Sequence, residues 1–265
     1  MNIIAIDIGN TNIRAGLFIN DAETMMEKIA GGNSEEIAKV LKTYWQKIPF
    51  SKASKDKTKR DGVIVTASVS PKWTDAVKKI AKEQLNEKVL EVGIGKDVPL
   101  PMELDVDEPK QVGVDRVLAA FAAYSVVEDA VIIADFGTAV TVDVVDEKGV
   151  FLGGVILPGF DISADALNRY TAVLPKIGKV EVPQKPFGKN TAEAINNGLY
   201  YSAIGALETI TRFYAESLGK WPQTIATGGN MEILKSGCDF IDSFAEGLVV
   251  KGIVLAYKKY VGEKL

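Results

Sequence analysis

Two stretches of the sequence place an aspartate at the end of an apolar run and follow it with glycine and a small polar residue. They read IIAIDIGNTN at 3–12 and VIIADFGTAV at 131–140. Glycine lets the backbone approach an anion closely, and the N–H groups of such a turn point at phosphate oxygens. The carboxylates of Asp7 and Asp135 could hold magnesium (Mg²⁺) or orient its water shell. Two such turns facing each other would hold the phosphates of a nucleotide; the alternative is two ordinary hairpin turns.

The sequence contains no histidine, which excludes histidine-based triads, histidine-ligated zinc and histidine general bases. Acid–base chemistry then falls to carboxylates, lysine or tyrosine. No G-x-x-x-x-G-K-[ST] sequence occurs, so a P-loop is not expected. Asp115 lies in the tetrapeptide GVDR at 113–116, at the start of an apolar helix. Its charge either stabilises the N-terminus of the helix or accepts the proton of an alcohol that attacks a γ-phosphate.

Three further segments have both a structural and a functional interpretation. Thr191 precedes a helix, where it either caps the helix or contacts a substrate. The glycines of GGVILPG (153–159) either end a strand and form a turn, or allow a ligand to approach. Gly228 and Gly229 follow a short strand, where the missing side chains leave room for a base or a ribose.

The composition limits the class of protein. With 265 residues, the chain is long enough for one large domain or two moderate ones with a sizeable core. A net charge of -4 argues against nucleic acid or an anionic membrane as the main partner. A single cysteine, Cys238, fits a reducing cytosol. Asp7 interrupts the apolar start, and no apolar run approaches the roughly 18 residues that span a bilayer, so we expect a cytoplasmic protein.

Apolar strands and amphipathic helices predict an α/β protein with an internal duplication. The opening strand–turn–strand pattern, at 2–8 and 12–19, returns at 130–135 and 139–145. The other expected strands are 62–69, 150–156 and 224–227, and the expected helices are 34–48, 71–86, 112–127, 161–172 and 191–218, followed by two closing helices. The proline-containing segment 98–109 is expected to be a linker or a crossing loop.

Six motifs, in order along nearly the whole chain, resemble those of the type III pantothenate kinases, a family of the actin, sugar kinase and heat-shock chaperone superfamily. They are DIGNTN (7–12), GVDR (113–116), DFGTAVTVD (135–143), GGVILPG (153–159), GKNTAEAINNG (188–198) and TGG (227–229). The resemblance implies an α/β, duplicated ribonuclease H-like (actin-like ATPase) fold, with two lobes of mixed sheets flanked by helices and a central nucleotide cleft. The expected lobes are residues 1–110 and 111–265, the second with the substrate site and a dimer interface.

The resemblance also implies a function: ATP-dependent phosphorylation of pantothenate to 4′-phosphopantothenate, the first step of coenzyme A biosynthesis, with Asp115 as the catalytic base. The implied cofactors are ATP, magnesium at Asp7 and a monovalent cation (potassium or ammonium) at Asp135, two roles that could be exchanged. The implied ATP-binding residues are Asp7, Ile8, Gly9, Asn10, Thr11, Asn12, Ile13, Arg14, Thr138, Gly228 and Gly229. The implied substrate-binding residues are Gly113, Val114, Asp115, Arg116, Val106 and Thr191, the last contributed across the interface of a homodimer.

Val106 departs from the family pattern, because many members carry tyrosine seven residues before the first glycine of the G-x-D-R motif. The loss of an aromatic side chain that packs on the substrate bears on the identity of the acceptor more than on kinase chemistry. Two alternatives therefore stay open: a kinase of the same fold for another small alcohol or sugar, and a catalytically silent ATP-binding regulator. The presence of Asp7, Asp115 and Asp135 argues against the regulator.

Overall fold

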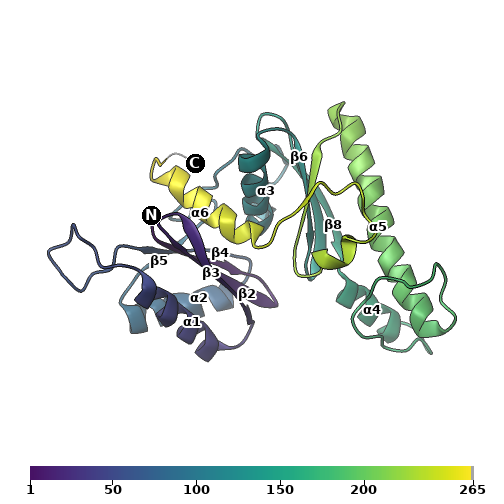
Figure 1. The fold of residues 1–265 in the computed structure, drawn as a ribbon, viewed down its shortest axis with the longest axis horizontal. Helices are drawn as coiled ribbons and strands as arrows, with labels where there is room; N and C mark the ends of the chain where they lie inside the picture. The colour runs from purple at the N-terminus through teal and green to yellow at the C-terminus, as the bar shows by residue number, and fades with distance from the viewer. Residues whose placement is uncertain (264–265) are drawn as a thin grey trace. The chain divides into compact units, whose positions relative to one another are not determined.

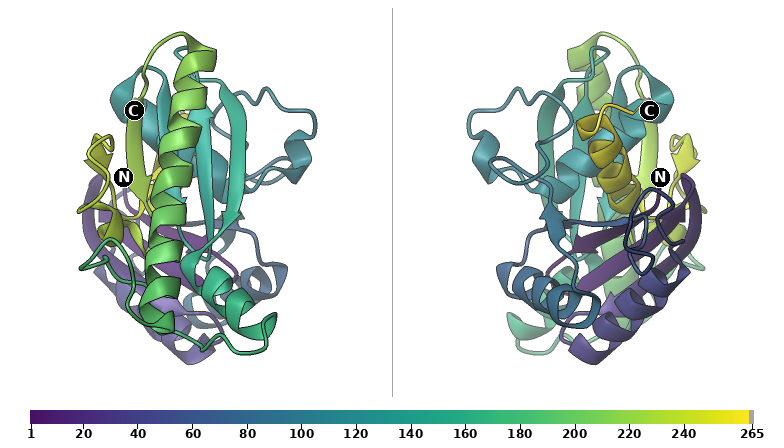
Figure 2. Two further views of the ribbon diagram at one scale, coloured as in Figure 1. Left: turned by 90° about the vertical axis from the view of Figure 1, so that its right-hand side faces the viewer. Right: turned by 90° about the vertical axis from the view of Figure 1, so that its left-hand side faces the viewer.

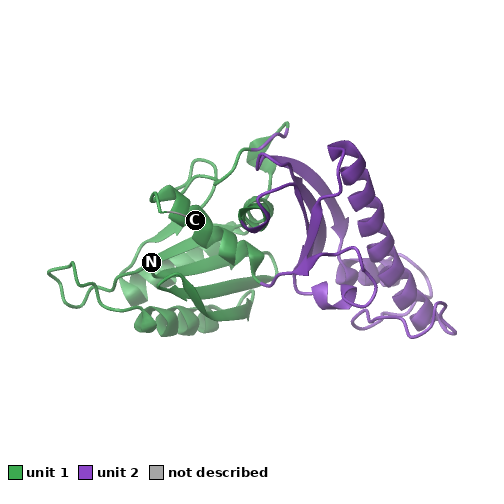
Figure 3. Ribbon diagram, turned by 45° about the horizontal axis from the view of Figure 1, so that its top comes forward, with its two compact units in different colours: residues 1–103, 107–125, 247–265 green, residues 104–106, 126–246 purple. Residues whose placement is uncertain are grey.

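The computed structural model describes residues 1–263, which form two compact units (Figure 3). Unit 1 comprises residues 1–103, 107–125 and the segment from 247 onward, and unit 2 comprises residues 104–106 and 126–246. The chain passes between these two compact units more than once, and the expected division into lobes 1–110 and 111–265 stays a prediction.

The sheet of unit 1 is mixed and has the strand order β3-β2-β1-β4-β5 (Figure 1). Its strands are β1 (Ile3–Ile8), β2 (Asn12–Ile19), β3 (Ala22–Ala30), β4 (Val63–Ser68) and β5 (Val89–Glu91). The sequence did not indicate β3, because AETMMEKIA is largely exposed and has no apolar alternation. The strand forms because Asn20 and Asp21 adopt φ angles of 50° and 69°, which turn the chain back along β2.

Helices cover both faces of this sheet. Helices α1 (Ser34–Lys47) and α2 (Pro71–Ile80) lie on one face, where alternate residues of β1 join Tyr44 and Trp45 in the core. Helix α6 (Leu248–Tyr260) contacts β1, β2 and β4 and lies on the opposite side of the sheet (Figure 1). A Cβ at Gly252 would clash with the carbonyl of Leu118, so this glycine allows α6 to pack closely on α3 (Val114–Val127). This packing explains why both helices belong to unit 1.

The sheet of unit 2 is also mixed and has the strand order β10-β9-β6-β7-β8. Its strands are β6 (Val131–Phe136), β7 (Ala139–Val145), β8 (Phe151–Pro158), β9 (Gln223–Thr227) and β10 (Ser243–Phe244). The long helix α5 (Thr191–Leu218) runs along one face of the sheet (Figure 2, left), and α4 (Phe160–Arg169) packs against it. Cys238 is buried in this core, and burial raises the pKa of its thiol to about 11.

Of the two expected closing helices, only α6 forms. The residues before it make a short 3₁₀ turn (Met231–Leu234) and then β10. Asp242 holds this segment beside β9, because its carboxylate accepts from the N–H of Thr224 (2.7 Å) and its own N–H donates to the carbonyl of Thr224 (2.9 Å).

No helix within residues 1–263 has the combination of length and apolarity needed to cross a membrane.

The two sheets repeat one topology. In each, the first three strands are antiparallel neighbours, and the first strand pairs in parallel with the fourth, β1 with β4 and β6 with β9. Asp7 lies opposite Ala67 of β4, and Asp135 lies opposite Thr227 of β9. The duplication expected from the two strand–Asp-x-Gly–strand stretches is therefore confirmed, with both aspartates at the same place in their sheets.

Candidate functional site

The first Asp-x-Gly turn connects β1 to β2 and is held by its backbone. The N–H of Gly9 donates to the carbonyl of Asn12 (3.0 Å), and the N–H of Gly31 donates to the carbonyl of Thr11 (2.8 Å). A Cβ on Gly31 would lie 2.7 Å from that carbonyl oxygen, so glycine is required for this approach. The side chain of Thr11 is exposed and Asp7 is half-buried. Two backbone hydrogen bonds thus fix the shape of the turn.

The second turn, between β6 and β7, is built in the same way. The N–H of Gly137 donates to the carbonyl of Ala139 (3.1 Å), and the N–H of Gly159 donates to the carbonyl of Thr138 (3.1 Å). A Cβ on Gly159 would clash with the carbonyl of Thr138. Asp135 is half-buried and Thr138 is exposed, as at the first turn. A glycine that follows the third strand therefore clamps the turn in both units, which an ordinary hairpin turn does not need.

The loop after β9 lies directly against Asp135. Gly228 has a φ of +98°, a conformation that favours glycine. A Cβ on Gly228 would lie 2.5 Å from Oδ1 of Asp135, and the N–H of Asn230 donates to the carbonyl of Phe136 (3.0 Å). Unit 2 thus brings two sequence-predicted site residues, Asp135 and Gly228, into one place.

The segment 7–14 contains side chains with different exposures. Ile8 and Ile13 are 0% and 1% exposed and belong to the core of unit 1, so a ligand could meet only their backbone. Asp7 and Arg14 are both half-buried and lie directly opposite each other in the antiparallel β1–β2 pair. Directly opposite residues point to the same face of a sheet. A carboxylate and a guanidinium therefore share one face beside the first turn.

Asp115 lies in the first turn of α3, with its carboxylate folded back toward Gly113. Its Oδ1 accepts a hydrogen bond from the N–H of Arg116 (2.9 Å), and a Cβ on Gly113 would lie 2.5 Å from the same oxygen. Within residues 1–263, the Asp115 carboxylate makes no other hydrogen bond. One carboxylate oxygen thus accepts from an N–H of the first turn of α3, and the other accepts no hydrogen bond from the described residues.

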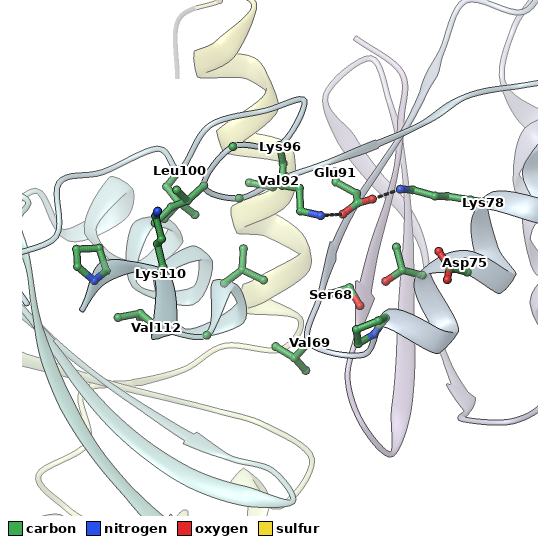
Figure 4. A pocket seen from close by; sticks show the side chains of 18 residues that line it. Ser68, Val69, Asp75, Lys78, Glu91, Val92, Lys96, Leu100, Lys110 and Val112 are labelled. Carbon is green, nitrogen blue, oxygen red and sulfur yellow. Dashed lines mark hydrogen bonds and ion pairs between the residues drawn. The ribbon is translucent and has the colours of Figure 1, made fainter. Parts of the chain in front are cut away.

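Gly113 also lines a cavity of about 840 Å³ in unit 1 (Figure 4). Three segments surround the cavity. They are the end of β4 together with the start of α2, the turn after β5, and the segment that leads into α3. Its apolar walls include Val69, Val92, Leu100 and Val112. The carboxylate of Asp115 thus lies against a residue that lines a cavity able to hold a small molecule.

Charged side chains line the same cavity. Glu91 is only 9% exposed and pairs with two lysines, Lys78 and Lys96, the latter at 2.8 Å (Figure 4). Lys110 and Asp75 make no ion pair or side-chain hydrogen bond within residues 1–263, and Figure 4 shows them on different walls. Sequence reasoning missed this group, because its members come from separate elements and have no characteristic spacing. The only available signal was a glutamate at the end of an apolar run.

The sequence model of the family described as type III pantothenate kinase matches residues 3–212. The chain belongs to the type III pantothenate kinase family. A relative of that name from Persephonella marina is 34% identical over 255 residues, which cover 96% of this chain and 98% of the relative. Another of the same name, from Moorella thermoacetica, is 33% identical over 263 residues, which cover 97% of this chain and 99% of the relative.

Solved structures confirm the fold. A candidate 2-dehydro-3-deoxygalactonokinase from Sinorhizobium meliloti superposes with a TM-score of 0.56 over 97% of this chain and 98% of that chain. The two sequences are 11% identical, so the likeness concerns the fold alone. The expected α/β, duplicated actin-like ATPase fold, with two mixed sheets flanked by helices, is confirmed by this match and by the repeated topology.

Val106, where the sequence was expected to depart from the family pattern, lies in unit 2. It is half-buried in the short segment 104–106, which joins β8 through a bridge between Leu104 and Phe151. One methyl group of Val106 lies 3.6 Å from the position of a Cβ on Gly153. The GVDR segment belongs to unit 1, so neither unit alone contains every residue expected in the substrate site of the family.

Thr191 begins α5 but does not cap it. The cap is Asn190, whose side chain accepts from the N–H of Glu193 (2.9 Å), and the Glu193 carboxylate accepts in return from the N–H of Lys189 (2.7 Å). The capping interpretation of Thr191 is therefore wrong, because the preceding residue has the extended backbone of an N-cap. Thr191 is exposed, and its hydroxyl makes no side-chain hydrogen bond within the described residues.

Proposed function

We propose that this member of the type III pantothenate kinase family transfers the γ-phosphate of ATP to the primary hydroxyl of pantothenate. The product is 4′-phosphopantothenate, and the reaction is the first step of coenzyme A biosynthesis. The observation that carries the proposal is the Asp115 carboxylate, which lies against Gly113 at the wall of the cavity in unit 1. Because the sequence has no histidine, a carboxylate is the natural general base.

In the proposed reaction, Asp115 accepts the proton of the pantothenate hydroxyl as the hydroxyl oxygen attacks the γ-phosphorus. The new oxygen–phosphorus bond forms while the bond from the γ-phosphorus to the bridging oxygen breaks, and ADP leaves with that electron pair. Arg116 would hold the substrate or the developing phosphate charge, because its planar fork matches carboxylate and phosphate oxygens. Catalysis comes mainly from positioning and from neutralisation of charge.

The two clamped turns are proposed to bind ATP. Residues 7–14 and Thr138 would contact the phosphates, and Gly228 with Gly229 would face the adenosine. The support for this assignment is the pair of close glycine approaches, at residues 31 and 159, that hold both turns in the same way. Each turn contains an exposed threonine and follows a strand that carries a half-buried aspartate.

Asp7 is proposed to hold magnesium and Asp135 a monovalent cation, potassium or ammonium, with an exchange of the two roles as the alternative. One carboxylate fits magnesium, which usually takes one or two protein carboxylates together with substrate phosphates. Residues 1–263 contain no group of three or more histidine, cysteine, aspartate or glutamate side chains that could hold a metal ion. A bound cation supplies positive charge that offsets the charge of the phosphate oxygens.

We further propose a homodimer in which Thr191 contributes to the substrate site of a second copy. Unit 2 exposes large apolar side chains, among them Tyr170 at 88%, Val173 at 86% and Phe187 at 61%. Tyr201, on the same helix as Thr191, is also exposed. Large exposed apolar side chains are typical of surfaces that bind another protein.

The proposal is tested by ADP release from purified protein with ATP, magnesium and pantothenate, with and without potassium or ammonium. We expect cation-dependent turnover that falls by about 10² to 10⁴ in Asp115→Asn. Asparagine retains an oxygen that can accept from the N–H of Arg116, so the variant should keep its thermal midpoint. Turnover of a hexose but not of pantothenate would indicate a sugar kinase, and ATP binding without turnover of any acceptor would indicate a regulator; either result rejects the proposal.

A further inference from the structure

The cavity of unit 1 contains one cation that the described residues do not neutralise. Lys78 and Lys96 both pair with Glu91, which is almost completely buried. Lys110 lines the same cavity and makes no ion pair or side-chain hydrogen bond within residues 1–263. An anionic ligand in this cavity could therefore bind Lys110 without breaking an existing ion pair.

The position of Lys110 is set by a short 3₁₀ turn, Pro109–Gln111, immediately before the GVDR segment. The N–H of Gln111 donates to the carbonyl of Glu108 (3.0 Å), and the proline restricts the backbone. Figure 4 shows the Lys110 side chain extending beside Leu100, with Val112 on the same segment. The lysine and the proposed base, Asp115, are thus carried by one short, locally ordered stretch of chain.

The facing wall of the cavity restricts the charge of the ligand. Asp75, on α2, lies on a different wall from Lys110 and has no ion pair within the described residues (Figure 4). Its carboxylate would repel a second anionic group but would accept a hydrogen bond from a hydroxyl or amide N–H. With the apolar surface of Val69, Val92 and Leu100, the cavity suits a molecule with one carboxylate, an apolar body and neutral donors better than a polyphosphate.

We propose that Lys110 binds the carboxylate of the acceptor in this cavity and thereby determines acceptor specificity. The inference rests on the proposed phosphorylation of pantothenate, a monocarboxylate with neutral hydroxyl and amide groups. In this arrangement Lys110 binds the acceptor equally in the ground state and in the transition state. Its loss should therefore act mainly on the KM of the acceptor rather than on kcat.

The test compares pantothenate with panthenol, the analogue in which a hydroxymethyl group replaces the carboxylate. In Lys110→Met, kcat/KM for pantothenate relative to panthenol should fall about tenfold to a hundredfold, the range of a lost charged hydrogen bond, mostly through the KM of pantothenate. Lys110→Arg should restore most of this ratio. The matched control is Lys79→Met, an exposed lysine of α2 that does not line the cavity, for which the ratio should not change.

The outcomes separate the inference from the proposed function. If the unmodified protein phosphorylates pantothenate and Lys110→Met has the same preference for pantothenate over panthenol, the role of Lys110 is rejected while the proposed function stands. If the unmodified protein phosphorylates neither compound, both are rejected. A rise in the KM of ATP that equals the rise for pantothenate would indicate a general structural effect, and would also reject the inference.

Discussion

The Asp115 carboxylate occupies the space that a side chain at residue 113 would need, since its Oδ1 lies 2.5 Å from the Cβ position of Gly113. The backbone of Gly113 is outside the left-handed region, so alanine can adopt it. Gly113→Ala should therefore displace the carboxylate and leave the fold intact. We expect kcat for pantothenate phosphorylation to fall about tenfold or more, because small displacements of reacting groups are costly. ADP release at saturating substrate concentrations measures the effect.

The control for this variant is Gly178→Ala. A Cβ on Gly178 would have no atom within 4 Å, so this change should leave kcat and the urea midpoint the same. If Gly113→Ala also keeps its full kcat, the carboxylate does not need its observed position and its role as the base is wrong.

The clamp on the second Asp-x-Gly turn leads to a separate prediction. In Gly159→Ala the new Cβ would clash with the backbone carbonyl of Thr138, which cannot rotate away as a side chain can. We expect the turn to shift and the affinity for ATP to fall about tenfold or more, with a loss of stability of about 1–3 kcal/mol from overpacking. Nucleotide titration and urea unfolding measure the two effects.

Gly205→Ala is the control in the same unit, because it should stabilise the protein where Gly159→Ala should destabilise it. Gly205 lies within α5 with open space around its Cβ position, so alanine should raise stability by about 0.5–1 kcal/mol through helix propensity alone. ATP binding should not change. An unaltered ATP affinity in Gly159→Ala would show that the geometry of this turn does not matter for the nucleotide.

The sheets were predictable from the sequence wherever burial dominates the pattern. Strands β1 and β6 lie in the middle of their sheets, so they appear as continuous apolar runs. Strand β3 lies at an edge and is mostly exposed, so only its hairpin turn, with positive φ at two non-glycine residues, could have indicated it. The short strand β5 has too few residues for any periodicity to appear.

The site was predictable only where its residues are contiguous. The turns at residues 7–12 and 135–138 and the GVDR segment are local motifs, and each is visible as a string of letters. The group of Lys78, Glu91 and Lys96 is formed by tertiary packing of separate elements, which no local pattern encodes.

The helix start at α5 shows a limit of a different kind. Asparagine and threonine both cap helices well, so the letters alone do not decide between two neighbouring residues. The backbone angles decide it, because Asn190 has the extended conformation of a cap and Thr191 is the first helical residue.

The ion-pair group of the cavity makes a prediction about stability. Glu91→Gln leaves Lys78 and Lys96 without their shared carboxylate in a partly buried place. Both lysines are about half exposed, so solvent screens much of the effect, and we expect a loss of about 1–2 kcal/mol in the free energy of unfolding. Urea unfolding at low and high salt measures it, and the loss should shrink as salt is added.

Glu83→Gln is the matched control. Glu83 forms an exposed pair with Lys79 at 3.9 Å, so its removal should cost no more than about 0.5 kcal/mol. Equal effects of the two substitutions would mean that the buried position of Glu91 adds nothing to the stability of the fold.

The start of α5 allows the structural and functional roles of two adjacent residues to be separated. Asn190→Ala removes the cap and should lower the free energy of unfolding by about 1 kcal/mol. Thr191→Ala removes an exposed hydroxyl that takes no part in the cap, so stability should change by less than about 0.5 kcal/mol. If Thr191 contacts pantothenate across a dimer, its variant should instead raise the KM of pantothenate several-fold, and the KM of ATP should stay the same. Unfolding curves and kinetics of the two variants therefore distinguish a structural role of Thr191 from a contact with pantothenate. An effect of Thr191→Ala on unfolding but not on the KM of pantothenate would show that this residue supports the helix and does not contact the substrate.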